Sequence, residues 1–596
     1  MSPDKFYFYN SLAILLKAVE GERTMVDLRN EASIYGTVEQ ADGYMNIVMR
    51  DCVFTDPRGD KFPYEIFFVH ARNIRDVHIP PNVSINTHRS SLSIQIIVII
   101  IFFKFETYYL RLIEQTFIYF NALVSKMSVF KFTDYDCIGF DLDNTLLRYN
   151  VTNMVRLEYE VLANFLVEQR GYDKKSLYKP LGDEDVDFMQ KGLILDFDKG
   201  NVLKICSKGT IRRASHGTHL MSEEEILRTY PNRRWEATDA LVEKTLDTWN
   251  GPMSLKMRSL LDYFDMPACL AFARAVDSLD ANNSGSSECY KIWPDVLDGM
   301  IYMFDGKYFR ADKGEYFPAL KKNPEKYLRK SSDKSIAWLR EIKRKKITFL
   351  LTGSYADFAD FTASYTLGDD WRSLFDIVVC YAKKPGFFTD KRSFVAMSGY
   401  DEDEAVTGAQ LARGKVYSQG NWKELKAFFG KICKNDSPKC LYVGDNMIQD
   451  IYVANAHADF DTVAISEELQ SEGIPNVPPH LDEKTLNSDY WGSYFCVEDS
   501  EGAVDSFWGH IVENHSKICV PLMETITEKS IDESYECFDK KKKTRGFYPS
   551  KPRTEPLSML PTLKAKRAAQ NQRDGEAAVQ RILKDREEEK TATDNA

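Results

Sequence analysis

The feature that most constrains the fold is an apolar run that ends in two acidic residues. Ile138-Gly-Phe140 is followed at once by Asp141 and, two residues later, by Asp143. A short apolar run of this kind predicts a buried strand, and ligand sites in open α/β sheets lie where such strands end. Two neighbouring carboxylates repel each other, so the pattern also predicts a cation beside them, most simply Mg²⁺.

Three later segments repeat the arrangement of a strand that ends in polar side chains. In chain order the four strand ends carry Asp141 with Asp143, then Thr352 with Gly353 and Ser354, then Lys384, and finally Asp445 with Asp450. A hydroxyl in a small turn suits phosphate oxygens, and a lysine suits their charge. Because parallel strands end at the same edge of a sheet, we expect one phosphoryl-transfer site there.

This set of motifs resembles the haloacid dehalogenase superfamily and, within it, the cytosolic 5′-nucleotidase type. The resemblance extends over about residues 134–515 and includes the runs 140–149, 384–388 and 442–446. It implies an α/β fold with a Rossmann-like parallel sheet in residues 127–520. The long gap between Thr145 and Thr352 leaves room for a cap domain inserted at about 150–335, which would close over the site and select the leaving group.

The resemblance also implies a role for each residue. Asp141 would attack phosphorus and form an aspartyl-phosphate, while Asp143 would protonate the leaving oxygen and later take a proton from water. Phosphate binding falls to Thr352, Gly353, Ser354 and Lys384, where Lys384 rather than Lys383 matches the Lys-Pro dipeptide of the family. Mg²⁺ would be held by Asp141, the backbone carbonyl of Asp143, Asp445 and Asp450.

The reaction implied is hydrolysis of a phosphate monoester, and the family name suggests a nucleoside 5′-monophosphate. Family membership alone is weak support for a substrate. His216, in an Ala-Ser-His-Gly run, has two interpretations: contact with substrate in the manner of the family, or a structural role, which is commoner for a lone histidine. The alternative for the whole domain is a catalytically idle relative.

Residues 1–88 form a separate module. An amphipathic helix over 8–20 followed by five strand-like runs predicts a small, strongly bent β-barrel. The run from Gly36 to Asn46 and the run from Val69 to Arg75 resemble the two motifs of the Sm family. Within that family the likeness is greatest to Sm-D-like subunits of the particle that processes histone pre-mRNA ends.

The Sm resemblance implies a subunit of a heteroheptameric ring that binds U-rich single-stranded RNA together with other Sm subunits. Tyr44 would stack on a base, Asn46 would bind its edge, and Arg72 would pack on it. The usual Arg-Gly pair falls here on His70-Ala71, so Arg72 would have to replace the missing arginine. In the alternative, purely structural interpretation, Tyr44 and Asn46 have only turn and packing roles. The second hypothesis for the chain is therefore an RNA-ring subunit with a passenger phosphatase.

Two segments fit neither module. Residues 89–126 contain the β-branched and aromatic run Ile94–Phe103, which is shorter than the about 20 residues of a membrane helix. Three interpretations stay open: a linker or packed element, a membrane helix extended into the charged residues that follow, or translated non-coding sequence at a junction of two genes. Residues 521–596 are polar and lysine-rich, which predicts a charged, partly disordered tail.

Composition sets the cellular context. Hydrophobic residues make up 43% and charged residues 28% of the chain, as in soluble globular proteins. The net charge of −11 argues against a generally basic nucleic-acid coat, although not against a local RNA site. The 11 cysteines are scattered without a CxxC pair, and no signal peptide is visible. We expect a cytoplasmic protein without membrane partners, with the nucleus as a second location through the Sm-like module.

Overall fold

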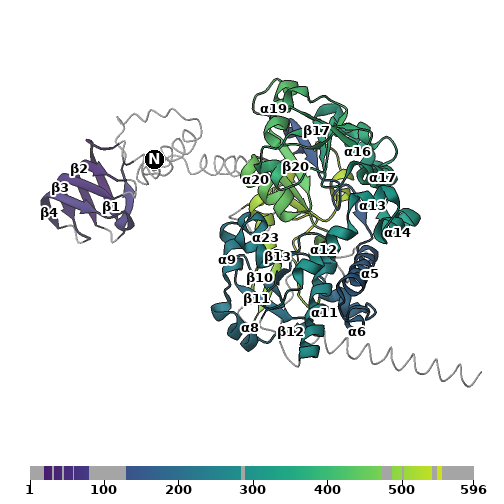
Figure 1. Cartoon of the computed structure of the whole chain (residues 1–596). Coiled ribbons are helices and arrows are strands. Elements are labelled where there is room, and N and C mark those ends of the chain that lie inside the picture. Colours follow the sequence, from purple (N-terminus) through teal and green to yellow (C-terminus); the bar gives the residue numbers. More distant parts are fainter. Residues whose placement is uncertain are drawn as a thin grey trace, which may run out of the picture. The chain divides into compact units, whose positions relative to one another are not determined.

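The computed structural model describes residues 16, 19–29, 32–42, 46–57, 60–78, 129–283, 289–472, 486, 488–499, 502–539 and 546–552 (Figure 1). The chain divides into two compact units, Met1–Ser125 and Lys126–Ala596, which are considered separately. The apolar segment predicted at 89–126 and the end of the tail from 553 lie outside the described residues. Within the described part, no helix has both the length and the apolar character needed to cross a membrane.

The N-terminal unit is an antiparallel sheet of five strands, as the sequence predicts. Its strands are β1 (Arg23–Leu28), β2 (Ser33–Ala41), β3 (Ile47–Thr55), β4 (Lys61–Val69) and β5 (Ile74–Val77), in the spatial order β4-β3-β2-β1-β5. Alternate side chains such as Val26, Ile34 and Val38 are fully buried. A Cβ atom at Gly36 would lie 2.4 Å from the Cβ of Cys52, so only glycine fits where β2 and β3 approach.

The C-terminal unit is built on a sheet of nine strands. Its spatial order is β18 (Asp401–Val406), β17 (Phe394–Ser398), β19 (Lys415–Gln419), β16 (Ile377–Cys380), β15 (Ile347–Leu351), β7 (Cys137–Phe140), β20 (Cys440–Gly444), β21 (Asp461–Ile465) and β24 (Ile518–Val520). The seven strands from β19 to β24 are parallel, and the β17–β18 hairpin adds an antiparallel edge. β7 is the first strand of this sheet in chain order, and later strands are added on both sides of β7. The topological switch point therefore lies at β7.

Helices cover both faces of this sheet, so its central strands β16, β15, β7 and β20 are fully buried and almost entirely apolar, whereas β18 at the edge is acidic and mostly exposed. They include α16 (Asp333–Lys345), α17 (Ala356–Leu367), α18 (Gly386–Thr389), α19 (Trp422–Cys433), α20 (Val453–Ala458), α21 (Glu468–Ser471) and α23 (Phe507–His515). Alternation along β15 puts Phe349 in one hydrophobic cluster and Leu350 in the other. A strand buried on both faces reads as a continuous apolar run, which is why β7 was recognisable in the sequence.

A large insertion separates β7 from β15. The chain leaves the sheet through β8 (Arg148–Tyr149) and returns through β14 (Leu328–Arg329), and these two short strands pair with each other. Between them lies a second sheet in the order β12 (His219–Leu220), β11 (Ile211–His216), β10 (Asn201–Ile205), β9 (Ile194–Asp196) and β13 (Met257–Ser259). In Figure 1 this sheet lies below the main one. The cap that the sequence predicts at about 150–335 falls in this region.

The helices of the insertion pack on one another and on its sheet. They are α5 (Val151–Arg170), α6 (Lys174–Leu177), α7 (Asp183–Phe188), α8 (Glu223–Thr229), α9 (Glu236–Glu243), α10 (Asp247–Asn250), α11 (Met266–Asn283), α12 (Trp293–Met303), α13 (Gly306–Ala311), α14 (Tyr316–Lys322) and α15 (Pro324–Tyr327). The longest, α5, ends where Gly171 takes φ +76°, a left-handed cap that glycine adopts without strain.

The folded unit continues beyond residue 520, where the sequence predicted a charged tail. In this part α24 (Glu524–Thr527) and β25 (Tyr535–Glu536) form, and β25 pairs with β6 (Val129–Phe130). Ile526, Ile531 and Tyr535 are buried at 0–2% exposure. The predicted start of the tail is therefore wrong, because a few apolar residues spaced among the polar ones are enough to fix the chain.

All eleven cysteines are free, as their scattered spacing predicts. Four of them, Cys137, Cys380, Cys440 and Cys519, are buried in strands of the main sheet. The sulfur atoms of Cys137 and Cys433 lie 4.0 Å apart, at the distance of a weak S–H···S hydrogen bond and not of a disulfide.

Candidate active site

Four loops at the carboxyl edge of the main sheet bring the predicted residues together. Asp141 and Asp143 follow β7, Thr352 to Ser354 follow β15, Lys384 follows β16, and Asp445 follows β20. Asp450 lies one turn further, in the π-helical segment η7 (Met447–Tyr452). Because β16, β15, β7 and β20 are neighbours and parallel, their ends meet at the switch point of the sheet.

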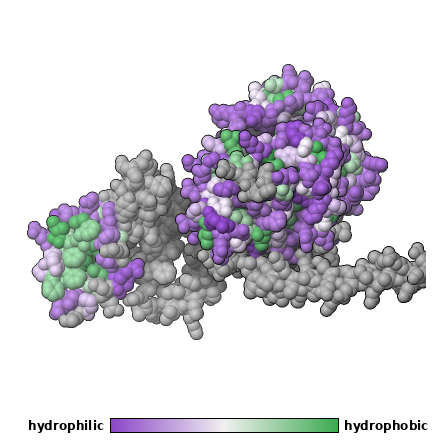
Figure 2. Space-filling view, turned by 60° about the horizontal axis from the view of Figure 1, so that its bottom comes forward, coloured by the Kyte–Doolittle hydropathy of each residue, from purple (hydrophilic) through white to green (hydrophobic). Residues whose placement is uncertain are grey.

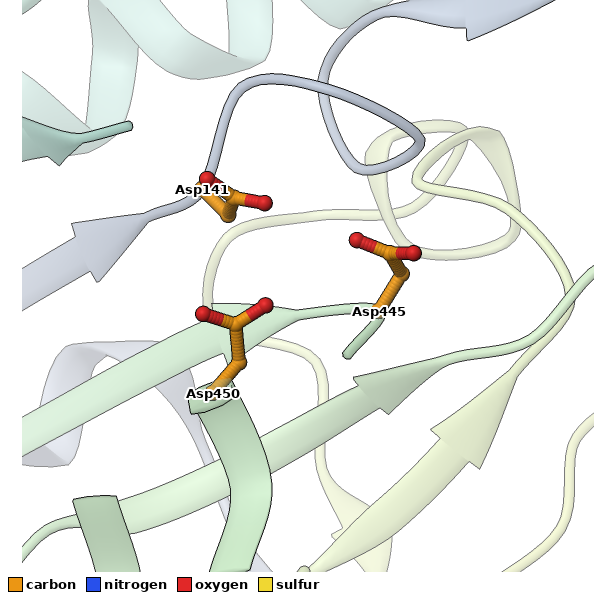
Figure 3. A group of neighbouring side chains, drawn as sticks. All are labelled: Asp141, Asp445 and Asp450. Carbon is orange, nitrogen blue, oxygen red and sulfur yellow. The ribbon is translucent and has the colours of Figure 1, made fainter. Parts of the chain in front are cut away.

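Three carboxylates form the centre of the site. Asp141, Asp445 and Asp450 each offer an oxygen, and these oxygens all lie within 4.8 Å of one another. Figure 3 shows the three side chains converging from the loops after β7 and β20. They are buried, with exposures of 7%, 4% and 0%. Three buried negative charges at this separation require compensation.

Lys384 supplies one positive charge to this cluster. Its Nζ lies 2.8 Å from Oδ1 of Asp141 and 2.6 Å from Oδ1 of Asp450. Burial opposes the charge of this lysine, but the two carboxylates outweigh burial and raise the pKa of Lys384. The neighbouring Lys383 points elsewhere, with its Nζ over the ring of Tyr381 at 4.6 Å. Lys384 is therefore the lysine at the site.

One lysine does not balance three carboxylates. Burial raises the pKa of Asp141 to about 8, although the charge of Lys384 acts to lower it. Burial also raises the pKa of Asp445 well above its usual range. Both shifts mean that the described residues alone do not stabilise full ionisation of the cluster.

The residues fit a divalent metal ion. The Oδ2 atom of Asp445 is buried and has no hydrogen-bond partner among the described residues, and Oδ1 of the same residue accepts a long hydrogen bond of 3.4 Å from Thr145. Carboxylate oxygens are the ligands that Mg²⁺ prefers. Asp141, Asp445 and Asp450 would hold the ion, whose charge would offset the excess of negative charge.

Asp143 lies beside this cluster but is held by hydroxyl groups. Its Oδ1 accepts a hydrogen bond of 2.7 Å from the hydroxyl of Tyr149, and its Oδ2 accepts one of 2.7 Å from Ser354. Thr352 lies 3.4 Å from the same Oδ2 and, through its own Oγ1, accepts a hydrogen bond from the backbone N–H of Ser354. The predicted phosphate-binding hydroxyls therefore surround the carboxyl group of Asp143.

The site opens into a cavity of about 310 Å³. Much of its wall is aromatic, formed by Phe264, Phe304, Phe309, Tyr316, Phe317, Tyr355 and Phe358. Gly353 and Ser354 also line it, together with the carboxylates and Lys384. All the aromatic wall residues except Tyr355 and Phe358 come from the insertion. The lining of the cavity thus combines charged groups, suited to phosphate, with aromatic rings, suited to a flat ring.

Sequence reasoning missed several residues of this site. Tyr149 and Asn446 lie inside motifs used for the prediction, yet neither was given a role; Asn446 caps η7 through hydrogen bonds to the backbone of Ile448 and Gln449. Asp262, which lines the cavity from the insertion, has no motif around it. His216 does not line the cavity: its ring nitrogens lie 2.7 Å from Asn201 and 2.8 Å from Asp280. Its structural interpretation is the one that the geometry favours.

Of the predicted RNA-binding residues, Asn46 lies just before β3 and the backbone of Arg72 lies shortly after β4. Tyr44 and the side chain of Arg72 are outside the described residues. The side-chain amide of Asn46 donates to Asp42 at 2.7 Å, and its oxygen accepts from the backbone N–H of Ala71 at 3.0 Å. These bonds join the loop after β2 to the 3₁₀ turn η1 (Ala71–Asn73), which contains Arg72. Two of the three predicted positions are therefore adjacent in the fold.

Comparison with known proteins finds a family match in each of the two units of the chain. A model of the 5′ nucleotidase family matches residues 127–476, and a model of the LSM domain matches residues 14–79. Human 5′-nucleotidase domain-containing protein 1 is 35% identical over 444 residues, which is 70% of this chain and 95% of that protein; its bovine counterpart is 35% identical over 441 residues, with the same coverage. Human 5′-nucleotidase domain-containing protein 2 is 25% identical over 347 residues, 57% of this chain and 62% of that protein.

Proposed function

The chain belongs to the 5′ nucleotidase family, with an LSM domain at its N-terminus, and we propose that its C-terminal unit is a Mg²⁺-dependent phosphate monoester hydrolase of the haloacid dehalogenase type. The observation that carries the proposal is the meeting of Asp141, Lys384, Asp445 and Asp450 at the carboxyl edge of four parallel strands. A nucleophile, a phosphate-binding cation and metal ligands are the parts that phosphoryl transfer requires.

In the first step a carboxylate oxygen of Asp141 attacks phosphorus, and the bond from phosphorus to the leaving oxygen breaks. Asp143 gives its proton to that oxygen, so the alcohol leaves neutral and an aspartyl-phosphate forms. Lys384 lies 2.8 Å from Asp141, where it can offset charge on the transferring phosphoryl group. Thr352, Gly353 and Ser354 bind the remaining phosphoryl oxygens.

In the second step a water molecule attacks the aspartyl-phosphate. Asp143, now ionised, takes a proton from this water, and phosphate leaves with regeneration of the Asp141 carboxylate. When bound by Asp141, the carbonyl of Asp143, Asp445 and Asp450, Mg²⁺ supplies positive charge that reduces repulsion between nucleophile and phosphate. With burial holding the pKa of Asp141 near 8, this added charge also favours the ionised nucleophile.

The aromatic wall supports a leaving group with a flat ring, and a nucleoside 5′-monophosphate is the substrate that we propose. Phe264 and Phe304 contact each other edge to face, with ring centroids 5.9 Å apart, in the wall of the cavity. A base stacked on this wall gains contact area without needing a charged partner. The relatives named for a 5′-nucleotidase domain point the same way.

The test is phosphate release by the full chain from a panel of nucleoside monophosphates and sugar phosphates, with and without Mg²⁺. We expect release that depends on Mg²⁺ and falls about a thousandfold or more in Asp141→Asn. Asp436→Asn is the matched control, because Asp436 is exposed in the loop before β20, away from the carboxyl edge. Absence of release from every substrate by folded protein would show that the domain is catalytically idle.

A second candidate function is supported by the N-terminal unit, which we propose to be an RNA-ring subunit of the Sm type. The strands β4 and β5 are the two edges of its sheet. Along β4, Phe62, Tyr64, Ile66 and Phe68 are exposed by 44–64%. Figure 2 shows hydrophobic residues gathered on this unit. An exposed apolar edge strand is a template for pairing with another chain, as a ring of neighbouring subunits requires.

Ring assembly would present Tyr44, Asn46 and Arg72 to U-rich single-stranded RNA. The process that we propose for this ring is histone pre-mRNA processing, which would place the protein in the nucleus. A hydrolase acting alone fits a cytoplasmic location. Co-expression with other Sm subunits, followed by measurement of the mass of the complex in solution, tests this function. Ile66→Lys should prevent co-assembly while leaving phosphate release unchanged, and co-assembly of this variant to the wild-type extent would contradict the role of β4.

A further inference from the structure

Tyr149 contacts both Asp143 and the aromatic wall of the active site, although it is not itself among the residues that line the cavity. Its hydroxyl donates a hydrogen bond of 2.7 Å to Oδ1 of Asp143, and its side chain is almost fully buried at 1% exposure. Asp143 and Ser354 line the cavity, whereas Tyr149 approaches Asp143 from the protein interior. Tyr149 is therefore placed to hold Asp143 without blocking substrate.

The two oxygens of Asp143 have different partners. Oδ2 accepts from Ser354 at 2.7 Å and lies 3.4 Å from Oγ1 of Thr352, and both of these residues belong to the phosphate-binding turn after β15. A bound phosphoryl group competes for these hydroxyls, because its oxygens are strong acceptors. Once the hydroxyls turn to phosphate, the hydrogen bond from Tyr149 to Oδ1 is the one that keeps the carboxyl group oriented.

Tyr149 also touches the wall that faces the leaving group. Its ring meets the ring of Phe264 edge to face, with centroids 5.3 Å apart, and Phe264 lines the cavity from the insertion. Tyr149 itself lies on β8, which pairs with β14 where the chain leaves and re-enters the main sheet. The same side chain thus joins the leaving-group wall, the base of the insertion and Asp143.

We propose that Tyr149 is a positioning residue that fixes the carboxyl group of Asp143 so that Oδ2 faces the leaving oxygen during proton transfer. The inference rests on the proposed function, in which Asp143 is the proton donor. It assigns Tyr149 no contact with substrate and no proton of its own in the reaction. A donor held in the right orientation transfers its proton efficiently, while a displacement of about 1 Å costs up to about a hundredfold in rate.

The test uses two substrates that differ mainly in how much they need a proton. The 4-nitrophenolate ion is a stable leaving group, whereas phenolate is a poorer one, and both rings fit the same aromatic wall. In Tyr149→Phe we expect kcat/KM to fall about tenfold or more for phenyl phosphate but less than about threefold for 4-nitrophenyl phosphate. Across a series of substituted phenyl phosphates, kcat/KM should depend more steeply on leaving-group acidity in the variant than in the wild type.

A matched control removes a bond of the same kind elsewhere in the unit. Tyr135 is fully buried, and its hydroxyl donates a hydrogen bond to Asp461 at 2.8 Å. Tyr135 precedes β7 in the chain, whereas Asp141 and Asp143 follow β7 at the carboxyl edge of the sheet. Tyr135→Phe should leave the ratio of the two kcat/KM values within about twofold of wild type, the size of effect expected away from reacting groups. Thermal unfolding of both variants reports any general damage to the fold.

The outcomes separate this inference from the proposed function. Equal losses for both substrates in Tyr149→Phe, or no loss for either, would overturn the positioning role while leaving the hydrolase intact. Absence of phosphate release by the wild type from these two substrates and from every nucleoside monophosphate and sugar phosphate of the panel would overturn the proposed function, and this inference with it. A selective loss for phenyl phosphate, absent from Tyr135→Phe, would support it.

Discussion

Replacement of Lys204 by methionine tests how the insertion is fixed to the rest of the C-terminal unit. Lys204 lies on β10 and is 5% exposed. The three shortest hydrogen bonds that its Nζ donates run to Oε1 of Gln190 at 2.6 Å, the carbonyl of Ser493 at 2.6 Å and the carbonyl of Trp491 at 3.1 Å, and a fourth runs to the carbonyl of Gly492 at 3.4 Å. Residues 491 and 493 come from a segment almost 300 positions later, so one ammonium group joins distant parts of the chain.

The magnitude follows from these three bonds. Methionine keeps most of the apolar stem but leaves three buried oxygens without their donor, at about 1–3 kcal/mol each. Removal of a buried ammonium also relieves its own desolvation cost, and breaking a buried charged contact costs about 3–5 kcal/mol net. We expect Lys204→Met to lower the free energy of opening the 488–493 segment by about 3 kcal/mol, or roughly 150-fold in the opening equilibrium.

Hydrogen exchange of individual amides measures this opening directly. The backbone N–H groups of Asp489 and Tyr490 donate to the two carboxylate oxygens of Asp187, so they exchange only when the segment leaves the insertion. Lys208→Met is the matched control, because Lys208 is an exposed lysine in the turn between β10 and β11. If exchange at Asp489 and Tyr490 in Lys204→Met stays within about threefold of wild type, the reasoning from the three bonds is wrong.

Three further outcomes are expected. Mg²⁺ at 100 times its dissociation constant should raise the free energy of unfolding by about 2.7 kcal/mol. Thermal unfolding of Asp445→Asn should show no such rise, and an equal rise in this variant would show that Asp445 is not a metal ligand. A Cβ atom at Gly444 would lie 2.5 Å from the Cβ of Asp450, so Gly444→Ala should displace that carboxylate and weaken Mg²⁺ binding about tenfold or more, measured by calorimetry. Glu158 is fully buried, neither of its carboxyl oxygens has a hydrogen-bond partner in the part of the chain that the structure describes, and burial raises its pKa well above the unfolded value of about 4.3. Above about pH 4 the folded state therefore keeps a proton that the unfolded state loses, so the free energy of unfolding of the wild type falls as pH rises. Glu158→Gln should be more stable than wild type by about 1–2 kcal/mol at pH 8 but not at pH 4, and urea unfolding at the two pH values measures this difference.

The centre of the candidate site could be predicted from sequence because its geometry follows from strand order. Asp141, Thr352, Lys384 and Asp445 each come directly after an apolar run, and parallel strands place their ends at one edge whatever lies between them. Strands β1 and β2 of the N-terminal unit could be predicted for a similar reason, since their alternation of buried with more exposed residues is a local signal.

The leaving-group side could not be predicted, because its residues meet only through tertiary packing. Phe264, Phe304 and Phe317 lie in three separate parts of the insertion, and each reads as an ordinary core aromatic. The continuation of the fold beyond residue 520 was missed for a related reason: β25 is two residues long, and its partner β6 lies about 400 residues earlier. A strand that short has no periodicity to detect.

The electrostatics of the site give an independent argument for a metal-dependent nucleophile. Burial raises the pKa of Asp141 to about 8 even with Lys384 at 2.8 Å, so the described residues disfavour the ionised form of this carboxyl group. A protonated carboxyl group does not attack phosphorus. A divalent cation shared with Asp445 and Asp450 would lower that pKa, as an opposite charge within a few ångströms does. Lys384 alone cannot take this role, because its charge is divided between Asp141 and Asp450. The same three carboxylates that repel one another therefore support the proposal that an ionised Asp141 depends on a metal ion.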